Sequence, residues 1–286
     1  MISIRRARAD DVEFLHELVH DDDVEPFLGG RAALDRESLL REIERSNDEP
    51  HDYGRFVIEV DGERAGGMGF EVANRRSRIA HLERLAVHPD FRGRRVSDEA
   101  ARLLQRYLVA DLGYHRLELE IYGFNERAQK HAERAGFRLE GVRRQAYWRH
   151  GVWMEGLLFA LIRDDLDVPA AIGLLHDYVM VHNNCVRTGD WAPLAEWFTD
   201  DAELAFDGVP VGPFEGREEI AQAYRDRPPD DEVVIFGVDE EDARVVARYG
   251  WLREPGTVAG RMLVTPRDGK IARLVVTFED PQRTAR

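Results

Sequence analysis

The segment 82–104 places the strongest constraint on the fold, because a strand, a tight turn and a helix follow one another there without a gap. Residues 82–87 have a strand-like composition, and His88-Pro89-Asp90 interrupts them. The basic turn Phe91-Arg92-Gly93-Arg94-Arg95 follows, and residues 97–104 have an amphipathic helical pattern. Free backbone N–H groups and the positive end of the dipole meet at a helix start. We therefore expect this turn, with its three arginines, to bind a pyrophosphate.

Length and composition indicate a globular protein of two domains. The chain has 286 residues, 43% hydrophobic and 33% charged, and two domains are the default at this length. It contains no apolar run of the roughly 18 residues that a membrane helix needs, and the start Met1-Ile2-Ser3-Ile4-Arg5-Arg6 lacks an apolar signal core. The single cysteine, Cys185, excludes an internal disulfide and is interpreted as a small core residue. These features predict a cytoplasmic protein.

The net charge of −15 argues against a nucleic-acid partner, because binding to phosphate backbones needs basic surfaces. The same charge fits, weakly, a cationic or amine substrate. The pattern predicts neither a metal site nor contact with a membrane.

The first half alternates predicted strands and helices. Strands are expected at 2–6, 56–60, 64–72, 79–87, 116–122, 137–147 and 152–162, and helices at 9–20, 35–45, 97–112 and 126–135. Asp61-Gly62 predicts a hairpin turn, His150-Gly151 another, and Gly136 ends a helix. The charged, proline-ended break at 164–169 predicts a boundary between a domain at 1–166 and a domain at 167–286.

The second half has helical segments first and strands after them. Helices are expected at 170–188, 190–199 and 218–225, and strands at 202–206, 233–238, 243–251, 258–265 and 271–278. Helices that precede a curved sheet predict an α+β cone with an interior pocket.

Residues 1–165 resemble the GNAT acetyltransferases. The resemblance rests on Leu85-Ala86-Val87-His88-Pro89, on the turn from Arg92 to Ser97, and on Phe124-Asn125-Glu126-Arg127-Ala128 followed by Gly136-Phe137. The tail Tyr147-Trp148-Arg149-His150-Gly151-Val152-Trp153 is similar to the branch that acetylates the terminal alanine of ribosomal proteins. The resemblance implies an α/β domain with the GNAT fold, a mixed central sheet flanked by helices.

The resemblance also implies acetyl-CoA as the co-substrate. The family's phosphate-binding motif falls on Arg92, Gly93, Arg94, Arg95, Val96 and Ser97. By the same resemblance the pantetheine lies along Leu85, Ala86 and Val87 and meets Asn125. Arg95 stands where the family usually has glycine, and Ser97 where it has glycine or alanine. A positive φ at Arg95 would cost about 1–2 kcal/mol; its side chain would either crowd the phosphates or point outward and add a cation.

Amine acetylation needs a base, because an amine with a pKa near 10.4 is only about one part in 10³ neutral at pH 7. His81 and Glu83 are the candidate bases, since they lie two apart on one face of a predicted strand. Glu83 could instead form an ion pair with Arg84 or Arg116, and His81 could be structural. The resemblance implies that backbone N–H groups near Ala86 and Val87 stabilise the oxyanion.

The general acid is the least defined part of this site. Many GNAT enzymes have a tyrosine seven residues after the asparagine, which is Ala132 here, and the alanine-acetylating branch has a serine three residues after it, which is Ala128 here. Tyr147 or Tyr122 could substitute, or the thiolate could leave without an acid.

Residues 170–281 resemble the SnoaL-like branch of the nuclear-transport-factor-2-like superfamily. The resemblance rests on Gly189-Asp190-Trp191, on residues 197–202, on residues 214–220 and on Tyr224. The catalytic positions of the superfamily's ketosteroid isomerases fall on His182, Phe206 and Arg261, with Asp207 one residue off, so the catalytic set is incomplete. We expect a binding pocket or a dimerising module. Its candidate lining residues, which could equally fill the core, are His182, Trp191, Trp197, Phe206, Tyr224, Tyr249 and Trp251.

The sequence thus predicts an acetyl-CoA-dependent N-acetyltransferase fused to a SnoaL-like domain. Its acceptor would be a primary amine, either a protein N-terminus, a small amine or an aminoglycoside, and its assembly a homodimer. Two rival hypotheses remain open. The first is a degenerate domain that senses acyl-CoA without turnover, and the second is an isomerase, cyclase or ligand-binding activity in the C-terminal half.

Overall fold

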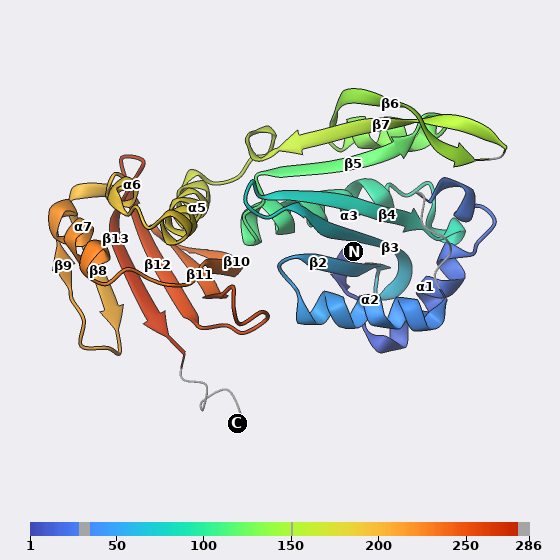
Figure 1. The fold of residues 1–286 in the computed structure, drawn as a ribbon. Coiled ribbons are helices and arrows are strands. Elements are labelled where there is room, and N and C mark those ends of the chain that lie inside the picture. The colour runs from blue at the N-terminus through green and yellow to red at the C-terminus, as the bar shows by residue number, and fades with distance from the viewer. Residues whose placement is uncertain (29–34, 150, 280–286) are drawn as a thin grey trace. The chain divides into compact units, whose positions relative to one another are not determined.

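The computed structural model describes residues 1–28, 35–149 and 151–279. These residues form two compact units (Figure 1). The first consists of residues 1–109 and 114–166, and the second of residues 110–113 together with the chain from Asp167 onward.

A seven-stranded mixed sheet forms the centre of the first unit. The strands are β1 (Ile2–Arg6), β2 (Tyr53–Val60), β3 (Glu63–Asn74), β4 (Ile79–Val87), β5 (Arg116–Tyr122), β6 (Arg138–Arg149) and β7 (Val152–Ile162). Their order in the sheet is β1-β2-β3-β4-β5-β7-β6. Every neighbouring pair is antiparallel except β4 and β5, which run parallel. The β4–β5 pair is therefore a parallel pairing within an otherwise antiparallel sheet.

Among the described residues, four α-helices cover this sheet. They are α1 (Val12–Val19), α2 (Arg36–Asp48), α3 (Val96–Arg106) and α4 (Glu126–Arg134). Helix α2 packs on β2 and α1 on β3, whereas α3 packs on β1 and β4 and α4 on β6. Figure 1 shows α1 and α2 together on one side of the sheet. The predicted GNAT fold, with a mixed sheet flanked by helices, is confirmed.

Two predicted turns are present where the sequence placed them. Asp61 and Gly62 have φ values of 54° and 86°, which is the left-handed pair that a tight hairpin requires, and they join β2 to β3. Gly136, with a φ of 92°, follows α4 as a C-terminal glycine. The predicted turn at His150-Gly151 includes His150, which lies outside the described residues.

The ends of two predicted helices need correction. The predicted helix at 9–20 is a 3₁₀ turn, Ala9–Asp11, followed by α1, because the buried Asp11 carboxylate turns back to accept a hydrogen bond from Arg8 N. The predicted helix at 97–112 starts at Val96 and becomes a π-helix over Tyr107–Asp111. This wider turn lets Tyr107 reach Arg6 while Leu108 stays buried.

The second unit consists of a six-stranded sheet and three α-helices. The helices are α5 (Ala170–Thr188), α6 (Ala192–Ala195) and α7 (Arg217–Asp226), and the strands are β8 (Phe198–Asp207), β9 (Phe214–Glu215), β10 (Val233–Glu241), β11 (Arg244–Trp251), β12 (Gly260–Arg267) and β13 (Lys270–Phe278). The sheet order is β10-β11-β12-β13-β8-β9, and β13 pairs parallel with β8. This mixed α+β arrangement confirms the predicted class.

The predicted helix at 190–199 was wrong in the second unit. Only the one-turn α6 forms, with Pro193 in its first turn, and β8 already begins at Phe198. Phe198 is fully buried in the core, and a strand conformation directs it there next to Tyr178 on α5. The two-residue strand β9 was not predicted.

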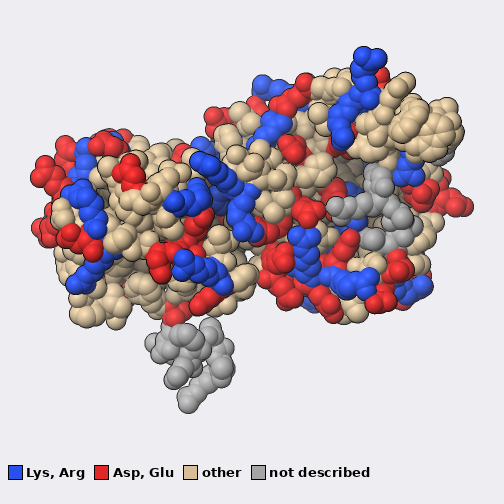
Figure 2. All heavy atoms as spheres, in the orientation of Figure 1, with Lys and Arg blue, Asp and Glu red and all other residues tan. Residues whose placement is uncertain are grey.

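No helix among the described residues is both long enough and apolar enough to cross a membrane. Figure 2 shows acidic and basic side chains interspersed over the drawn face of each unit.

Candidate functional site

Strands β4 and β5 separate part of the way along their length. They pair in parallel only at Ile79–Arg116, Ala80–Leu117 and His81–Glu118, although β4 continues to Val87 and β5 to Tyr122. Figure 1 shows the two strands together at their starts and apart at their ends. Among the described residues, no pairing joins them beyond this point. Backbone polar groups of β4 along this stretch can therefore bind an extended ligand.

The end of β4 leads directly into the start of helix α3. A short 3₁₀ turn, Pro89–Phe91, follows the strand, and Arg95 occupies the N-cap of α3 with φ 56° and ψ 24°. Gly93 also has a positive φ of 80°, and a Cβ added there would have no heavy atom within 4 Å. The positive φ anticipated at Arg95 is therefore present. At the start of α3 the N–H groups of Asp98 and Glu99 donate to Arg95 O at 3.2 Å. Those of Val96 and Ser97 precede the first intrahelical bond, and N–H groups in this position can bind an anion.

The three arginines of this turn differ in their surroundings. Arg92 is partly buried and directed away from the helix start, since its Nη1 lies 3.2 Å from Asp23 Oδ2 and its Nε 3.3 Å from Val87 O. Arg94 and Arg95 are exposed. Arg94 lies over the Phe91 ring at 5.9 Å. Two of the three guanidinium groups are therefore available to an anion in solvent, and Arg92 fixes the turn.

Asn125 caps helix α4 at the end of β5. Its Oδ1 accepts a hydrogen bond from Ala128 N at 3.1 Å, and the residue is 9% exposed. Among the described side chains, none accepts a hydrogen bond from its Nδ2.

The two candidate bases lie on β4 beside the separation. His81 pairs across the sheet with Glu71 on β3 and Glu118 on β5, and it is half-buried. The Glu83 side chain is 15% exposed, and its Oε1 lies 3.6 Å from Arg84 Nε. The alternative ion pair of Glu83 with Arg84 is therefore formed, whereas Arg116 pairs with Glu118 and Glu140.

Tyr147 lies on β6. Its neighbours Glu120 on β5 and Gly156 on β7 were not predicted from the sequence. Burial and the neighbouring Glu120 carboxylate raise the pKa of Tyr147 to about 12, although no hydrogen bond of normal geometry satisfies the buried Glu120 Oε1. Glu120 Oε2 instead accepts from Arg143 Nη1 at 2.8 Å. A Cβ at Gly156 would collide with Glu120 Oε1 and lie 2.9 Å from Tyr147 Cε2. Gly156 thus provides the space that Glu120 and Tyr147 share.

Tyr122, the alternative acid, occupies the end of β5. It is 4% exposed, and its hydroxyl accepts a hydrogen bond from Arg149 Nε at 3.1 Å. Its ring contacts Tyr147 edge-on at 4.9 Å and stacks on Phe124 at 5.4 Å. The other two acid positions, Ala128 and Ala132, lie on α4 and carry no hydroxyl.

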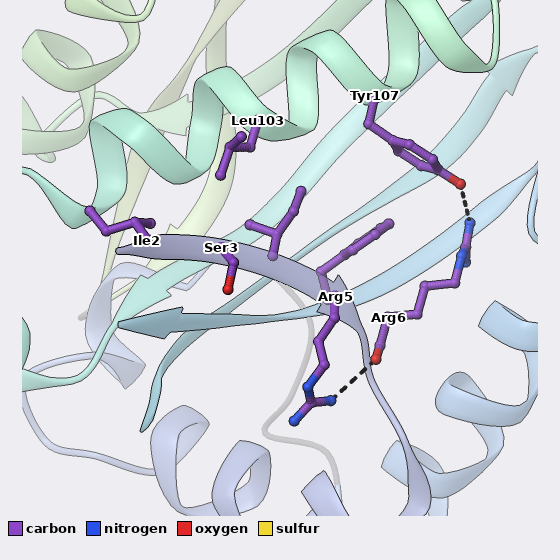
Figure 3. A pocket seen from close by; sticks show the side chains of 8 residues that line it. Ile2, Ser3, Arg5, Arg6, Leu103 and Tyr107 are labelled. Atoms are coloured by element: carbon purple, nitrogen blue, oxygen red, sulfur yellow. Dashed lines mark hydrogen bonds between the residues drawn. The ribbon is translucent and has the colours of Figure 1, made fainter. Parts of the chain in front are cut away.

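An open pocket of about 470 Å³ lies elsewhere in the first unit, between β1 and α3 (Figure 3). Its walls include Ile2, Ile4, Leu103 and Tyr107. Strands β2 and β3 separate β1 from β4 in the sheet, so this pocket is not part of the site at the β4–β5 separation.

In the second unit, four aromatic side chains form a buried cluster. His182 contacts the rings of Tyr178, Trp191 and Tyr224, and Tyr178 and Tyr224 share a hydrogen bond of 2.8 Å between their hydroxyls. Burial lowers the pKa of His182 to about 4. The cluster contains three of the predicted lining residues together with Tyr178, which the sequence analysis did not name.

The remaining predicted lining residues lie outside this cluster. Tyr249 and Trp251 contact each other on β11, Phe206 stacks on Phe278, and Trp197 packs on the core. Cys185 is fully buried, as predicted. Among the described residues of this unit no carboxylate is buried, and Asp207 is exposed. Nor do the described residues contain a group of three or more His, Cys, Asp or Glu side chains that could hold a metal ion.

Part of each unit matches a family model. Residues 2–138 match the model of the acetyltransferase (GNAT) domain, and residues 179–274 match the model of the SnoaL-like domain.

Two curated proteins are similar to the N-terminal half. The spermidine N(1)-acetyltransferase of Escherichia coli strain K12 is 23% identical over 170 residues, which are 57% of this chain and 86% of that protein. The SPbeta prophage-derived uncharacterized N-acetyltransferase YokL of Bacillus subtilis strain 168 is 26% identical over 84 residues, 29% of this chain. The chain thus spans about half (48%) of the length of this second relative.

Two solved structures share the fold of the first unit. One is a spermidine N-acetyltransferase from Vibrio cholerae in complex with CoA and spermine, with a TM-score of 0.52 and 18% identity over 57% of this chain and 96% of that chain. The other is RimL, a ribosomal L7/L12 alpha-N-protein acetyltransferase in complex with coenzyme A, with a TM-score of 0.51 and 19% identity over 58% and 96%.

Proposed function

Since the chain carries an acetyltransferase (GNAT) domain followed by a SnoaL-like domain, we propose that it is an acetyl-CoA-dependent N-acetyltransferase acting on a primary amine. The observation that carries the proposal is the separation of β4 from β5 directly before the left-handed turn at Arg95 and the start of α3. Similar proteins include acetyltransferases for spermidine and for a ribosomal protein N-terminus, which supports an amine acceptor.

The residues at this place fit acetyl-CoA. Gly93 and Arg95 have positive φ values in the turn that leads into the start of α3, and Arg94 and Arg95 are exposed cations of the same turn. Leu85, Ala86 and Val87 would hold the pantetheine through their backbone, and Asn125 Nδ2 would donate to it. Val96 and Ser97 would donate their first-turn N–H groups to the pyrophosphate.

Acetyl-CoA would supply an acetyl thioester whose carbonyl carbon is attacked by the neutral amine. Glu83, directly or through a water molecule, would take the proton from the incoming ammonium, and His81 on the same strand is the second candidate for this role. Backbone N–H groups near Ala86 and Val87 would stabilise negative charge on the carbonyl oxygen. Tyr147 would donate a proton to the departing thiolate.

The acceptor is a protein N-terminus or a small amine. A chain of net charge −15 attracts cationic acceptors by long-range electrostatics. The SnoaL-like domain would bind part of the acceptor or mediate oligomerisation. We do not assign it an isomerase activity, because no described residue of that unit supplies a buried carboxylate for proton abstraction.

The experiment that tests this proposal is calorimetric titration of the purified protein with acetyl-CoA, followed by a thiol-release assay with an amine panel. The panel contains a diamine, spermidine, an aminoglycoside and a peptide with a free N-terminal alanine. Saturable binding together with amine-dependent thiol release supports an N-acetyltransferase. Binding without release for every amine would favour the acyl-CoA sensor, and absence of binding would refute both.

A further inference from the structure

Strand β4 contains a bulge at Arg84. The backbone of Arg84 has φ 58°, in the left-handed region that non-glycine residues rarely adopt. The pairing of β4 with β3 shifts between Gly67 and Gly69, so two residues of β4 lie opposite one residue of β3. A bulge bends its strand, and this one lies where β4 has already parted from β5.

The Arg84 side chain is held by helix α2. Its Nη1 and Nη2 lie 2.6 and 3.0 Å from the two carboxylate oxygens of Glu42, which is the two-point geometry of a strong arginine–carboxylate pair. The Arg84 side chain is 8% exposed and that of Glu42 is 18% exposed. A backbone conformation that costs energy persists where its surroundings fix it, and this contact supplies such a restraint.

A second arginine shares the same carboxylate. Arg55 on β2 is 3% exposed, and its Nε lies 3.3 Å from Glu42 Oε2. Glu42 therefore links α2 to β2 and to β4 through two buried guanidinium groups. Glu83 is adjacent to this network, because Arg84 Nε lies 3.6 Å from Glu83 Oε1.

Stability alone does not account for this network. Two arginines and a glutamate lose much of their hydration here, and a buried ionic network of this kind is often no more stabilising than apolar side chains of the same volume. The network instead fixes the backbone conformation of the bulge, which lies between Glu83 and the rest of β4. Glu83 and the β4 backbone after the bulge both belong to the site described above.

We infer that Glu42 and Arg84, supported by Arg55, are positioning residues that hold the β4 bulge and thereby orient the Glu83 carboxylate toward the acceptor amine. The inference rests on the proposed acetyltransferase function. Glu83 interacts electrostatically with Arg84 on its own strand and with Tyr53 and Arg55 on β2.

The first test compares Arg84→Gly with Arg84→Ala. Both variants lose the cation beside Glu83, whereas only glycine adopts the left-handed conformation freely, so Arg84→Gly should melt at the higher temperature. In both, kcat should fall by up to about 100-fold, the cost of a misplaced catalytic group. The KM for acetyl-CoA should stay within about twofold, because uniform binding is untouched.

The second test is Glu42→Gln, which keeps the shape of the side chain and removes its charge. Hydrogen–deuterium exchange of the segment 82–88 should accelerate about tenfold relative to wild type, because the bulge loses its restraint. This measurement needs no turnover. It therefore decides the positioning role even if the wild-type protein acetylates no amine in the panel, a result that would refute only the proposed function.

The matched control is Arg5→Ala on β1. It removes the ion pairs of Arg5 with Asp11 and Glu59, at 2.6 and 2.7 Å. Strand β1, which carries Arg5, is separated from β4 by β2 and β3. This substitution should lower the melting temperature without lowering kcat or changing the exchange of 82–88. If kcat falls equally in Arg84→Gly and Arg5→Ala, or in neither, or if Glu42→Gln leaves the exchange of 82–88 unchanged, the inference is overturned.

Discussion

Tyr147 stands edge-on to Tyr122, with the two ring centroids 4.9 Å apart and the ring planes at 83°. The environments of the two hydroxyl groups differ. Tyr122 is buried, and its hydroxyl accepts a hydrogen bond from Arg149. Tyr147 is half-buried, and burial together with the Glu120 carboxylate raises its pKa to about 12. Tyr147 therefore stays protonated at neutral pH and, unlike Tyr122, is only half-buried.

We predict that Tyr147→Phe lowers kcat by about 100- to 10,000-fold, the usual contribution of a general acid. The pKa of Tyr147 is raised to about 12, and a group titrates within about one unit of its pKa. The wild-type profile of rate against pH should therefore show no basic limb from this residue below pH 11. Steady-state thiol release from pH 6 to 10 measures both effects. Tyr122→Phe is the control, since it loses the Arg149 hydrogen bond and should retain most of kcat. Equal rates for Tyr147→Phe and wild type would show that the thiolate leaves without this acid.

Arg95→Gly should have opposite effects on stability and on cofactor binding. The left-handed backbone at Arg95 (φ 56°) costs a non-glycine residue about 1–2 kcal/mol, so glycine should raise the melting temperature by a few degrees. The variant also loses an exposed cation beside the phosphate site, which should weaken acetyl-CoA binding by about two- to fivefold, less so at high salt. Differential scanning calorimetry and titration with acetyl-CoA measure the two effects.

Arg94→Ala separates the two effects at the same turn. Arg94 is exposed and does not have a positive φ, so its removal should weaken acetyl-CoA binding without raising the melting temperature. Tighter binding by Arg95→Gly than by wild type would mean that the Arg95 side chain crowds the phosphates.

Gly156→Ala should damage the site through a steric clash. A Cβ there would collide with Glu120 Oε1 and press on Tyr147, so the Glu120–Arg143 ion pair would have to move. Overpacking of this kind typically costs about 1–3 kcal/mol, and kcat should fall with it as Tyr147 shifts. Gly141→Ala on β6 is the matched control, because a Cβ there meets no heavy atom within 4 Å. Thermal melting and thiol release of both variants provide the test; equal behaviour would show that the clash relaxes without cost.

The sequence predicted those features that depend on neighbours along the chain. Arg95 stood at a position where a glycine was expected, so a positive φ could be anticipated there before the structure confirmed it. Nothing in the sequence around Arg84 indicated a bulge, because that bulge depends on the pairing with β3 and on Glu42, 42 residues earlier. Glu120 and Gly156 could not be found for the same reason: their contact exists only across paired strands.

The error at 190–199 also has a physical cause. The segment has a helical pattern, and Pro193 suits a first helical turn. Burial of Phe198 against Tyr178 on α5 stabilises a strand from that residue onward instead. Tertiary packing therefore overrode local preference, and β8 begins directly after one helical turn.

His182 should make the stability of the folded protein fall in weak acid. It is 3% exposed, and burial lowers its pKa to about 4 from the usual 6.5. Between those two values the unfolded chain binds a proton that the folded chain does not bind. The stability associated with neutral His182 is thus complete above pH 6.5 and is lost as the pH falls toward 4, by up to about 3 kcal/mol in total.

The measurement is the free energy of unfolding in urea at pH 7 and pH 4.5 for wild type and His182→Gln. The variant loses ring contacts with Trp191 and Tyr224, so it should be less stable at pH 7. It lacks the titrating imidazole, however, and its stability should fall less on acidification than that of wild type. Carboxylates titrate in both proteins, so only the difference between the two pH dependences reports on His182. Parallel losses in the two proteins would contradict a neutral, buried His182 and would mean that the ring takes up its proton without leaving the core.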